Sequence, residues 1–571
     1  MPSLTQIFTF ILDALFSISC IFMPLARWGT PSVDSVANIF YPVALSETVL
    51  LVNPAGLSRD EFDMLVSLQG ITAQDGEADI YLMMHTYHRY IEAYQAANPA
   101  QQFEEFEGTV WDLVERFVDE IPGRGFVAYN PPGNSQNPGI NMAATIAAAE
   151  GWLGVPDSLV EQAEAAGLVL MRDLRSMSGS YANQQLQIFR EFRSQLNNAM
   201  VVHQPPNNSA LRDFGIAQRA LTFFAPNDTY NNAMEYAREQ WLLWSVASWL
   251  RPNASVFGVW GMSGELHFVR KISRASLHVL PADHLRNGST LMGFAATEPI
   301  QQPYQNREIT AQPGNHYIAL MLSDGDNIQW LVGNAFFNGF IYDRLQTDDT
   351  FPISLTYAPL MAQLYPFVVQ YHYGLLTPGL QMICGVSGLG YTNITMVPAS
   401  TRHDYARLTA EAMEMADLRV MQLLDDLSLV PGLIGGRPPG LRGYRIINDF
   451  LAQEQITGGI WYMDPGRYES GQGRVYRGRN DKVFVTNRIS FWSPDGTYDG
   501  SSVTPEWIQE FADTINAFPR DPSRADGFSV INIHPWSIRY HHVQELVSLL
   551  DDHVVLLSAE EFVGLAAENI R

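Results

Sequence analysis

The segment MLSDGDNIQW, residues 321–330, places two carboxylates, an amide and an indole at the end of an apolar run. If the chain stays extended there, Asp324 and Asp326 point to the same side, roughly 6.5 to 7 Å apart. Two carboxylates that close raise the proton affinity of one of them, which suits an acid/base pair at neutral pH. Cleavage of glycosidic bonds uses such a pair. Glu265 and Asp464 also follow apolar runs and are alternative members of the pair.

This segment has three other interpretations. An EF-hand calcium loop needs Gly at its sixth position and a carboxylate at its twelfth, but counting from Asp324 places Gln329 and Ala335 there, which excludes it. A single divalent ion held by both carboxylates and distant groups stays open, although no recognisable spacing predicts a metal site or a cofactor. The structural alternative is that Asp324 caps a following helix while Asp326 or Asn327 bonds loop amides.

The second part of the chain carries regularly spaced strand signals that would position these groups. Apolar, β-rich runs alternate there with helical stretches, which favours parallel strands joined by helices. We therefore predict a (β/α) barrel or a closely related closed α/β sheet, with one or two of the nine strands wrong. The predicted strands span residues 255–260, 317–322, 352–357, 381–386, 418–424, 458–462, 483–489, 528–533 and 553–557.

Polar and aromatic residues follow several of these runs. Because the carboxyl ends of barrel strands converge on one mouth, these residues are candidates for substrate contact. The aromatic ones could stack on sugar faces, and His534 has no partners at a metal-ligand spacing. The predicted substrate-binding residues are Asn327, Trp330, Ser387, Gly388, Gly390, Tyr391, Trp461, His534 and Trp536.

The first part of the chain predicts a separate α/β domain. Strands are expected at 48–53, 79–84 and 125–130, and helices at 58–70, 141–153 and 235–250. In the helix at 58–70, Ser58 is the expected N-cap, Glu61 completes a capping box, and Gly70 is the expected stop. The predicted organisation is an apolar N-terminal segment (1–26), an N-terminal α/β domain (27–251) and a C-terminal barrel-like domain (252–571).

The amino-acid composition limits the classes of molecule that the protein could bind. Of 571 residues 46% are hydrophobic, and the net charge is -25 with no block of Lys or Arg, so nucleic acid is excluded as a partner. The two cysteines, Cys20 and Cys384, give no disulfide framework. The sequence leaves the oligomeric state open.

The apolar segment at residues 7–26 is either a secretory signal peptide, a signal-anchor or a buried N-terminal helix. We predict a secreted or extracellular protein that contacts a membrane only through this segment. Five sequons permit glycosylation, so a glycoprotein is expected; they begin at Asn207, Asn227, Asn253, Asn287 and Asn393.

The run SGLGYTNI at 387–394 resembles the signature of the GxGYxYP family of putative glycoside hydrolases. The GxGY half is present, while Asn393 and Ile394 replace the Tyr and Pro of the second half. SDGDN at 323–327, LSRDEFDMLVSLQGI at 57–71 and INIHPWS at 531–537 fit the same family in order, so the resemblance covers nearly all of the chain after residue 45. It implies an N-terminal α/β domain, a C-terminal barrel-like domain and a carbohydrate substrate, but no established catalytic residue.

Three functions therefore stay open from the sequence. The leading hypothesis is a glycoside hydrolase that uses carboxylate acid/base chemistry at the barrel mouth. The alternative is a non-catalytic extracellular glycan-binding or structural glycoprotein, which the altered motif and the sequons favour. The third is a metal-dependent enzyme similar to polysaccharide deacetylases, which also combine acidic residues with a histidine at a strand end; the paired-histidine motif is missing here.

Overall fold

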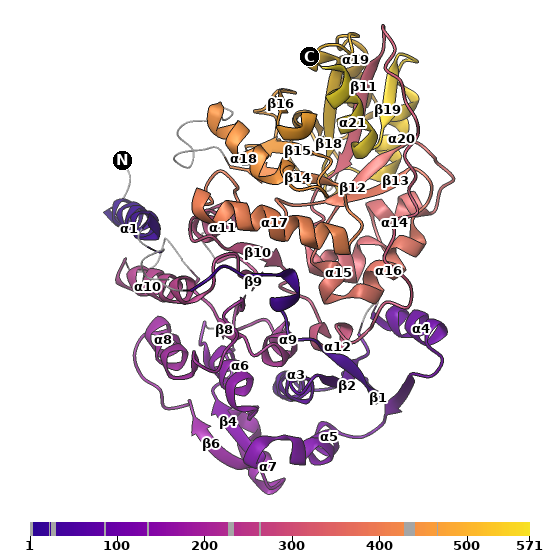
Figure 1. Ribbon diagram of the computed structural model, residues 1–571. Coiled ribbons are helices and arrows are strands. Elements are labelled where there is room, and N and C mark those ends of the chain that lie inside the picture. The colour runs from indigo at the N-terminus through magenta and orange to yellow at the C-terminus, as the bar shows by residue number, and fades with distance from the viewer. Residues whose placement is uncertain are drawn as a thin grey trace. The chain divides into compact units, whose positions relative to one another are not determined.

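A computed structural model gives the fold (Figure 1) and describes residues 4–21, 23, 30–84, 87–133, 136–226, 233–261, 264–426, 440–464, 466–498 and 500–570. The chain divides into two compact units. Unit 1 comprises Met1–Thr297 and Leu364–Val368, and unit 2 comprises Glu298–Gln363 and Val369–Arg571. Each unit has its own sheets, as the alternation of strand and helix signals predicted.

The described residues of unit 1 form three small sheets, and all of their strand pairs are parallel. The first has the order β2 (Glu77–Leu82), β1 (Ala44–Val52), β3 (Gln102–Phe106). The second has the order β5 (Leu153–Pro156), β4 (Gly125–Tyr129), β6 (Val169–Asp173). The third has the order β10 (His278–Pro281), β9 (Ser255–Gly258), β7 (Met200–His203), β8 (Leu221–Phe223).

Helices connect these strands. They are α3 (Arg59–Thr72), α4 (His88–Ala97), α5 (Val110–Phe117), α6 (Gly139–Glu150), α7 (Val160–Ala165), α8 (Tyr181–Phe192), α9 (Arg212–Ala217), α10 (Ala233–Trp249), α11 (Glu265–Arg274) and α12 (Gly288–Leu291). The predicted capping box at Ser58 and Glu61 is present. Gly70, predicted to stop α3, lies inside it. A Cβ there would meet the Asp213 carbonyl oxygen at 2.7 Å, so this glycine permits close packing against α9.

The structure places the main boundary between residues 297 and 298, whereas the sequence predicted residues 251 and 252. The reason is the strand at 255–260, which we expected to be the first barrel strand. As β9 it pairs with β7 and β10 in the third sheet of unit 1. An apolar run identifies a strand but not its partner, and the partner decides the domain.

Unit 2 is built on a closed ring of seven parallel strands. Around the ring these are β11 (His316–Leu322), β12 (Ile353–Tyr357), β13 (Leu380–Cys384), β14 (Val420–Asp425), β15 (Gly458–Met463), β17 (Val483–Phe491) and β18 (Phe528–Ile533), which pairs back with β11. Nearly all of their residues are buried, which explains why they read as continuous apolar runs rather than alternating ones. The predicted barrel is confirmed, and each of its strands had a counterpart in the sequence prediction.

Two further strands border the ring. The short β16 (Val475–Arg477) runs antiparallel to β17. Strand β19 (Val554–Leu557) pairs with the first half of β11, from His316 to Ala319, whereas β12 pairs with its end, at Met321 and Leu322. Strand β11 therefore has two successive neighbours on that side.

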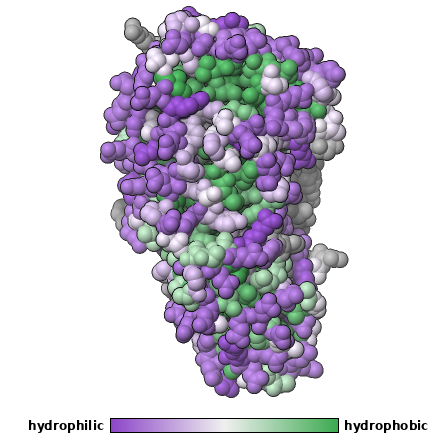
Figure 2. Space-filling model, turned by 90° about the vertical axis from the view of Figure 1, so that its right-hand side faces the viewer, coloured by the Kyte–Doolittle hydropathy of each residue, from purple (hydrophilic) through white to green (hydrophobic). Residues whose placement is uncertain are grey.

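The helices of unit 2 follow the strands in the order expected for a barrel. They are α13 (Ile328–Trp330), a π-helical turn at Leu331–Ala335, α14 (Phe340–Leu345), α15 (Met361–Leu364), α16 (Pro366–Leu375), α17 (Ala399–Met415), α18 (Leu441–Leu451), α19 (Pro505–Asn516), α20 (Tyr540–Ser548) and α21 (Ala559–Asn569). Residues Leu364–Val368, at the junction of α15 and α16, are grouped with unit 1. On the face shown in Figure 2, hydrophilic residues cover most of the surface and hydrophobic ones gather in a few patches.

The N-terminal helix α1 (Leu4–Ile21) contacts the rest of unit 1 through a buried polar cluster. The Asp13 carboxylate lies 2.8 Å from Lys271 Nζ and 3.2 Å from His267 Nε2, and it accepts a hydrogen bond from the Tyr236 hydroxyl. Burial alone would raise the pKa of Asp13, but His267 and Lys271 outweigh it and lower that pKa to about 2. None of the helices in the described ranges has the length and hydrophobicity of a membrane span. The secretory signal stays a prediction.

Candidate active site at the carboxyl ends of the barrel strands

The barrel brings most of the predicted residues to one end. Because the strands are parallel, residues that follow them lie at the same mouth. Asp324, Asp326, Asn327 and Trp330 follow β11; Ser387, Gly388, Gly390 and Tyr391 follow β13; Asp464 follows β15; and His534 and Trp536 follow β18. Glu265 does not belong to this set. It is the first residue of α11 in unit 1. It lies there because the strand that precedes it, β9, pairs with β7 and β10 in a sheet of unit 1.

The turn after β11 differs from the predicted extended strand. Asp324 has φ of 70°, in the left-handed region, and a turn follows at residues 325–326. A Cβ at Gly325 would lie 1.6 Å from the Thr356 carbonyl oxygen, so only glycine fits there. The chain bends at Asp324, so the two-residue alternation that would align Asp324 with Asp326 does not apply. Asn327 caps the next helix by accepting a hydrogen bond from Trp330 N at 3.0 Å, which is the role the structural alternative gave to Asp324.

Asp324 has two polar side chains as partners. Its carboxylate is hydrogen-bonded to the side chains of Ser323 and Trp536. Burial raises the pKa of Asp324, although these hydrogen bonds act against the shift. Burial and the nearby charge of Asp324 also raise the pKa of Tyr462. Tyr462 belongs to β15, on the far side of the ring from β11, so the charge of Asp324 is felt across the mouth.

Several aromatic rings surround this point. Tyr462 stacks on Tyr468 with ring centroids 5.2 Å apart, and Tyr468 packs edge-on against Trp492 at 5.7 Å. Trp492 in turn stacks on His534 at 3.5 Å. These rings come from β15 and the loop after it, and from the residues that follow β17 and β18. Tyr462 and His534 are buried, whereas Tyr468 and Trp492 are partly exposed and are the rings that a sugar face could meet.

Two other predicted substrate contacts, Trp330 and Trp536, form a pair. Their ring centroids lie 5.3 Å apart, and Trp536 is 38% exposed. His534 is buried, and burial lowers its pKa to about 3, so the imidazole is neutral. Its Nδ1 lies 2.9 Å from Ser537 Oγ.

The family signature loop lies in the interior. Ser387 Oγ donates to the Leu424 carbonyl at 3.2 Å and accepts from Leu424 N at 3.0 Å. The Tyr405 hydroxyl donates to the carbonyls of Ser387 and Gly390. Ser387 and Tyr391 are at most 3% exposed. These hydrogen bonds connect the loop after β13 to β14 and α17. The loop residues therefore support the barrel mouth from the interior.

Sequence reasoning missed the acidic end of β14. Asp425 is fully buried; one oxygen accepts from Thr395 N and Oγ1 at 2.9 and 2.8 Å, and the other accepts from Trp461 Nε1 at 2.8 Å. Burial raises its pKa to about 7. Trp461, predicted to contact substrate, is thus a buried partner of Asp425. The rule that selected Asp324 would also have found Asp425 and Asp426, had it been applied to the strand at 418–424.

Four strands that are neighbours around the ring carry buried polar side-chain atoms that make no hydrogen bond within the described chain. They are Gln422 Oε1 on β14, Tyr462 Oη on β15, Thr486 Oγ1 on β17, and both amide atoms of Asn532 on β18. Leaving such an atom without a partner costs about 1–3 kcal/mol. Ordered water or polar groups of a ligand are the usual partners in such sites.

Metal ligation has no evident ligand set here. Within the ranges that the structure describes, no group of three or more His, Cys, Asp or Glu side chains is placed to hold a metal ion. Asp324 is instead hydrogen-bonded to neutral groups. The deacetylase hypothesis therefore gains no support from the described residues.

Fold and site together define an α/β protein whose second unit is a parallel barrel with acidic and aromatic residues at its mouth. The chain belongs to the GxGYxYP family. Residues 314–567 match the GxGYxYP putative glycoside hydrolase C-terminal domain, residues 197–293 the GxGYxYP third domain, and residues 124–189 the GxGYxYP_N second domain.

Among solved structures, the chain is similar to a crystal structure of a putative hydrolase from Bacteroides thetaiotaomicron. The similarity covers 95% of this chain and 98% of that chain, with 21% sequence identity and a TM-score of 0.77. At this identity the likeness supports the fold alone. No curated protein matches the chain.

Proposed function

We propose that the protein hydrolyses a glycosidic bond of an extracellular glycan at the barrel mouth, with Asp324 as general acid and Asp464 as the second carboxylate. The description of the family as putative glycoside hydrolases supports the reaction class. The observation that carries the assignment is the position of Asp324 at the carboxyl end of β11, where its carboxyl group is hydrogen-bonded to Ser323 and to Trp536 from the end of the neighbouring strand β18.

Asp324 suits the role of acid because its carboxyl group keeps a proton more readily than an exposed one. Burial raises its pKa, so a larger fraction is protonated near neutral pH. The proton would pass to the oxygen that leaves as the glycosidic bond breaks. Activity should therefore fall as the pH rises through the raised pKa of Asp324, because the acid form is lost.

Asp464 is the best placed second carboxylate. It follows β15 two residues after Tyr462, and it is partly exposed. Its Oδ2 accepts a hydrogen bond from Ser470 Oγ at 2.9 Å, which orients the carboxyl group. Asp326 is 9% exposed within the turn, and Asp425 accepts three hydrogen bonds, so both suit structural roles better.

Substitution of each carboxylate gives a specific test. Purified protein is screened on a panel of glycans and aryl glycosides, together with Asp324→Asn and Asp464→Asn. The matched control is Asp481→Asn, whose side chain is 91% exposed and lies just before β17, at the opposite end of the barrel. Loss of a general acid should lower kcat by about 100-fold or more on natural glycosides.

The leaving group separates the two roles. A dinitrophenyl glycoside needs no protonation, so Asp324→Asn should keep most of its activity on it. Asp464→Asn should lose activity on both kinds of substrate, and Asp481→Asn should match the unmodified protein. Full activity of Asp324→Asn on natural glycosides would refute the assignment of the acid.

A glycan-binding function without catalysis is the second candidate. The exposed Trp536 beside Trp330 favours it, since an indole pair can bind sugar faces without any reaction. In that case the protein would bind a glycan without releasing product, and Asp324→Asn would bind it unchanged. Trp536→Ala would then weaken binding, whereas hydrolysis by the unmodified protein would exclude this candidate.

A further inference from the structure

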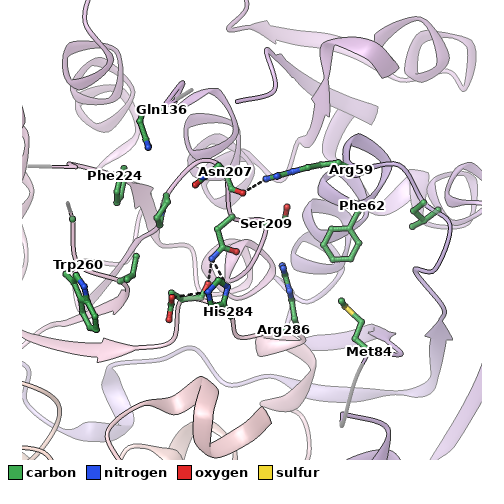
Figure 3. Close-up of a pocket in the computed structure, with 16 residues that line it drawn as sticks. Arg59, Phe62, Met84, Gln136, Asn207, Ser209, Phe224, Trp260, His284 and Arg286 are labelled. Carbon is green, nitrogen blue, oxygen red and sulfur yellow. Dashed lines mark hydrogen bonds and ion pairs between the residues drawn. The ribbon is translucent and has the colours of Figure 1, made fainter. Parts of the chain in front are cut away.

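Unit 1 contains a cavity of about 950 Å³ that the proposed function does not use (Figure 3). Its lining residues follow β1, β2, β4, β7, β8, β9 and β10, strands from all three sheets of the unit. In open parallel sheets, ligands bind outside the carboxyl ends of the strands. The volume lies within the range of ordinary small-ligand sites.

Two arginines point into this cavity. Arg59, the first residue of α3, is 48% exposed and donates from Nη2 to the Asn207 carbonyl at 2.6 Å. Arg286, which follows β10, places its guanidinium 5.3 Å from the centre of the Phe62 ring. Figure 3 shows Arg59 reaching from the side of Phe62 towards Asn207, and Arg286 pointing up between Phe62 and Ser209. The Nη1 atom of Arg286 is buried and has no acceptor within the described chain.

A third arginine lies below the loop at residues 205–209. Arg212 is 3% exposed and donates to Asn141 Oδ1 at 2.7 Å and to the Pro205 carbonyl at 3.2 Å. Burial, together with the charges of Arg59 and Arg286, lowers its pKa to about 10 against the opposing effect of Asp63. Arg59, Arg212 and Arg286 thus lie close enough together for their charges to repel one another.

Carboxylates offset part of this charge. Asp63 lies 3.5 Å from Arg59 Nε, and Asp213 accepts hydrogen bonds from Ser289 N and Oγ. Asp283, in the cavity wall, has its pKa raised by burial. None of these contacts engages Arg286 Nη1. Arg286 lines the cavity and is partly exposed, so its guanidinium can meet an anion there.

The opposite wall offers rings and neutral polar groups. Trp260 is partly exposed, and Phe224 lines the same side of the cavity in Figure 3. Asn208 Nδ2 donates to the Asp283 carbonyl at 2.7 Å, so the loop that carries it is fixed to the wall. An aromatic face beside fixed polar groups suits the apolar side and the hydroxyls of a sugar ring.

We propose that this cavity is a second ligand site that binds a saccharide carrying an oxyanion group, with the oxyanion between Arg286 and Arg59 and the sugar ring against Trp260. Residues of unit 1 alone form the site, so it does not depend on hydrolysis at the barrel. A uronic acid and a phosphorylated sugar share the required chemistry.

The test measures binding by isothermal titration calorimetry on the full chain carrying Asp324→Asn, which slows the proposed hydrolysis of a probe. The probes are digalacturonate, glucose 6-phosphate, neutral cellobiose and inorganic phosphate. We expect at least one charged sugar to bind about 10-fold or more tightly than cellobiose and inorganic phosphate. Preference for digalacturonate assigns a carboxylate ligand, and preference for glucose 6-phosphate assigns a phosphate ligand.

Variants locate the site. Arg59→Gln changes a half-exposed side chain and should fold, and Arg286→Gln removes the second cation; each should weaken binding of the preferred probe by about 10-fold or more. The control is Arg124→Gln, a side chain 53% exposed whose ion-pair partner is Asp119. Binding that Arg59→Gln leaves unchanged, equal binding of cellobiose, equal binding of inorganic phosphate, or no binding of either charged sugar would overturn the proposal.

Discussion

Raising the pH from 4 to 7 should destabilise the protein through one carboxyl group, that of Asp425. Burial raises its pKa from 3.8 to about 7. Between these values the folded protein keeps a proton that the unfolded chain has lost, so the free energy of unfolding falls as the pH rises. At about 1.4 kcal/mol per pH unit, the loss amounts to about 4 kcal/mol, complete once the pH exceeds the folded-state pKa. Other groups titrate over the same range, so the effect must be measured as a difference.

The assay compares urea denaturation of the unmodified protein with that of Asp425→Asn at several pH values from 4 to 8. The asparagine amide faces Trp461 Nε1, so the variant should be less stable at pH 4, but it has no proton to lose. The stability difference between the two proteins should therefore shrink by about 4 kcal/mol between pH 4 and 8.

A second measurement covers the case in which the variant does not fold. The infrared carbonyl band of a protonated carboxylic acid should disappear as the pH of the unmodified protein passes about 7. Trp461→Phe removes one hydrogen bond to the ionised form and should move that transition to higher pH. Parallel stability curves, or a band that is lost near pH 4, would show that Asp425 is ionised in the folded protein and would refute the reasoning.

Two further predictions concern stability. Asp13→Ala leaves Lys271, whose side chain is 3% exposed, without its carboxylate partner and should lower the free energy of unfolding by about 3 kcal/mol. In denaturant titrations, Asp13→Leu combined with Lys271→Met should recover most of this lost stability. An unchanged unfolding midpoint for Asp13→Ala would mean that α1 does not dock through this ion pair. Gly325→Ala puts a Cβ against the Thr356 carbonyl and should cost about 3 kcal/mol. Gly333→Ala, which meets nothing within 4 Å, is its matched control. Equal thermal stability of these two variants would contradict the tight turn after β11.

The strands of the barrel could be predicted because each is buried and therefore reads as a continuous apolar run. The domain boundary could not. The run that became β9 has the same character as a barrel strand, and only its pairing with β7 and β10 assigns it to unit 1. Glu265 follows β9 in the sequence and therefore lies in unit 1 rather than at the barrel mouth. The wrong assignment of one strand thus also gave one wrong candidate acid.

The candidate site was predictable in location but not in conformation. Strand ends identified Asp324, yet its left-handed backbone depends on the approach of Gly325 to Thr356, a contact between neighbouring strands. The same holds for the altered family motif, whose contacts depend on which strand ends lie together. Asn393, which replaces the tyrosine of the signature, accepts a hydrogen bond from Asp426 N at 2.9 Å. Its use could not be inferred without knowing that the ends of β13 and β14 lie together.

The pairing of β11 on both sides also affects how the barrel can fold during synthesis. This first barrel strand pairs with β18 on one side and with β19 and β12 on the other, and β18 and β19 are the last strands of the chain. Until the ribosome releases the final residues, β11 has an unpaired edge that could add strands from other nascent chains. Closing the ring requires contacts between segments far apart in sequence, which slows folding. A ribosome that stops before β18 would thus release a barrel that cannot close.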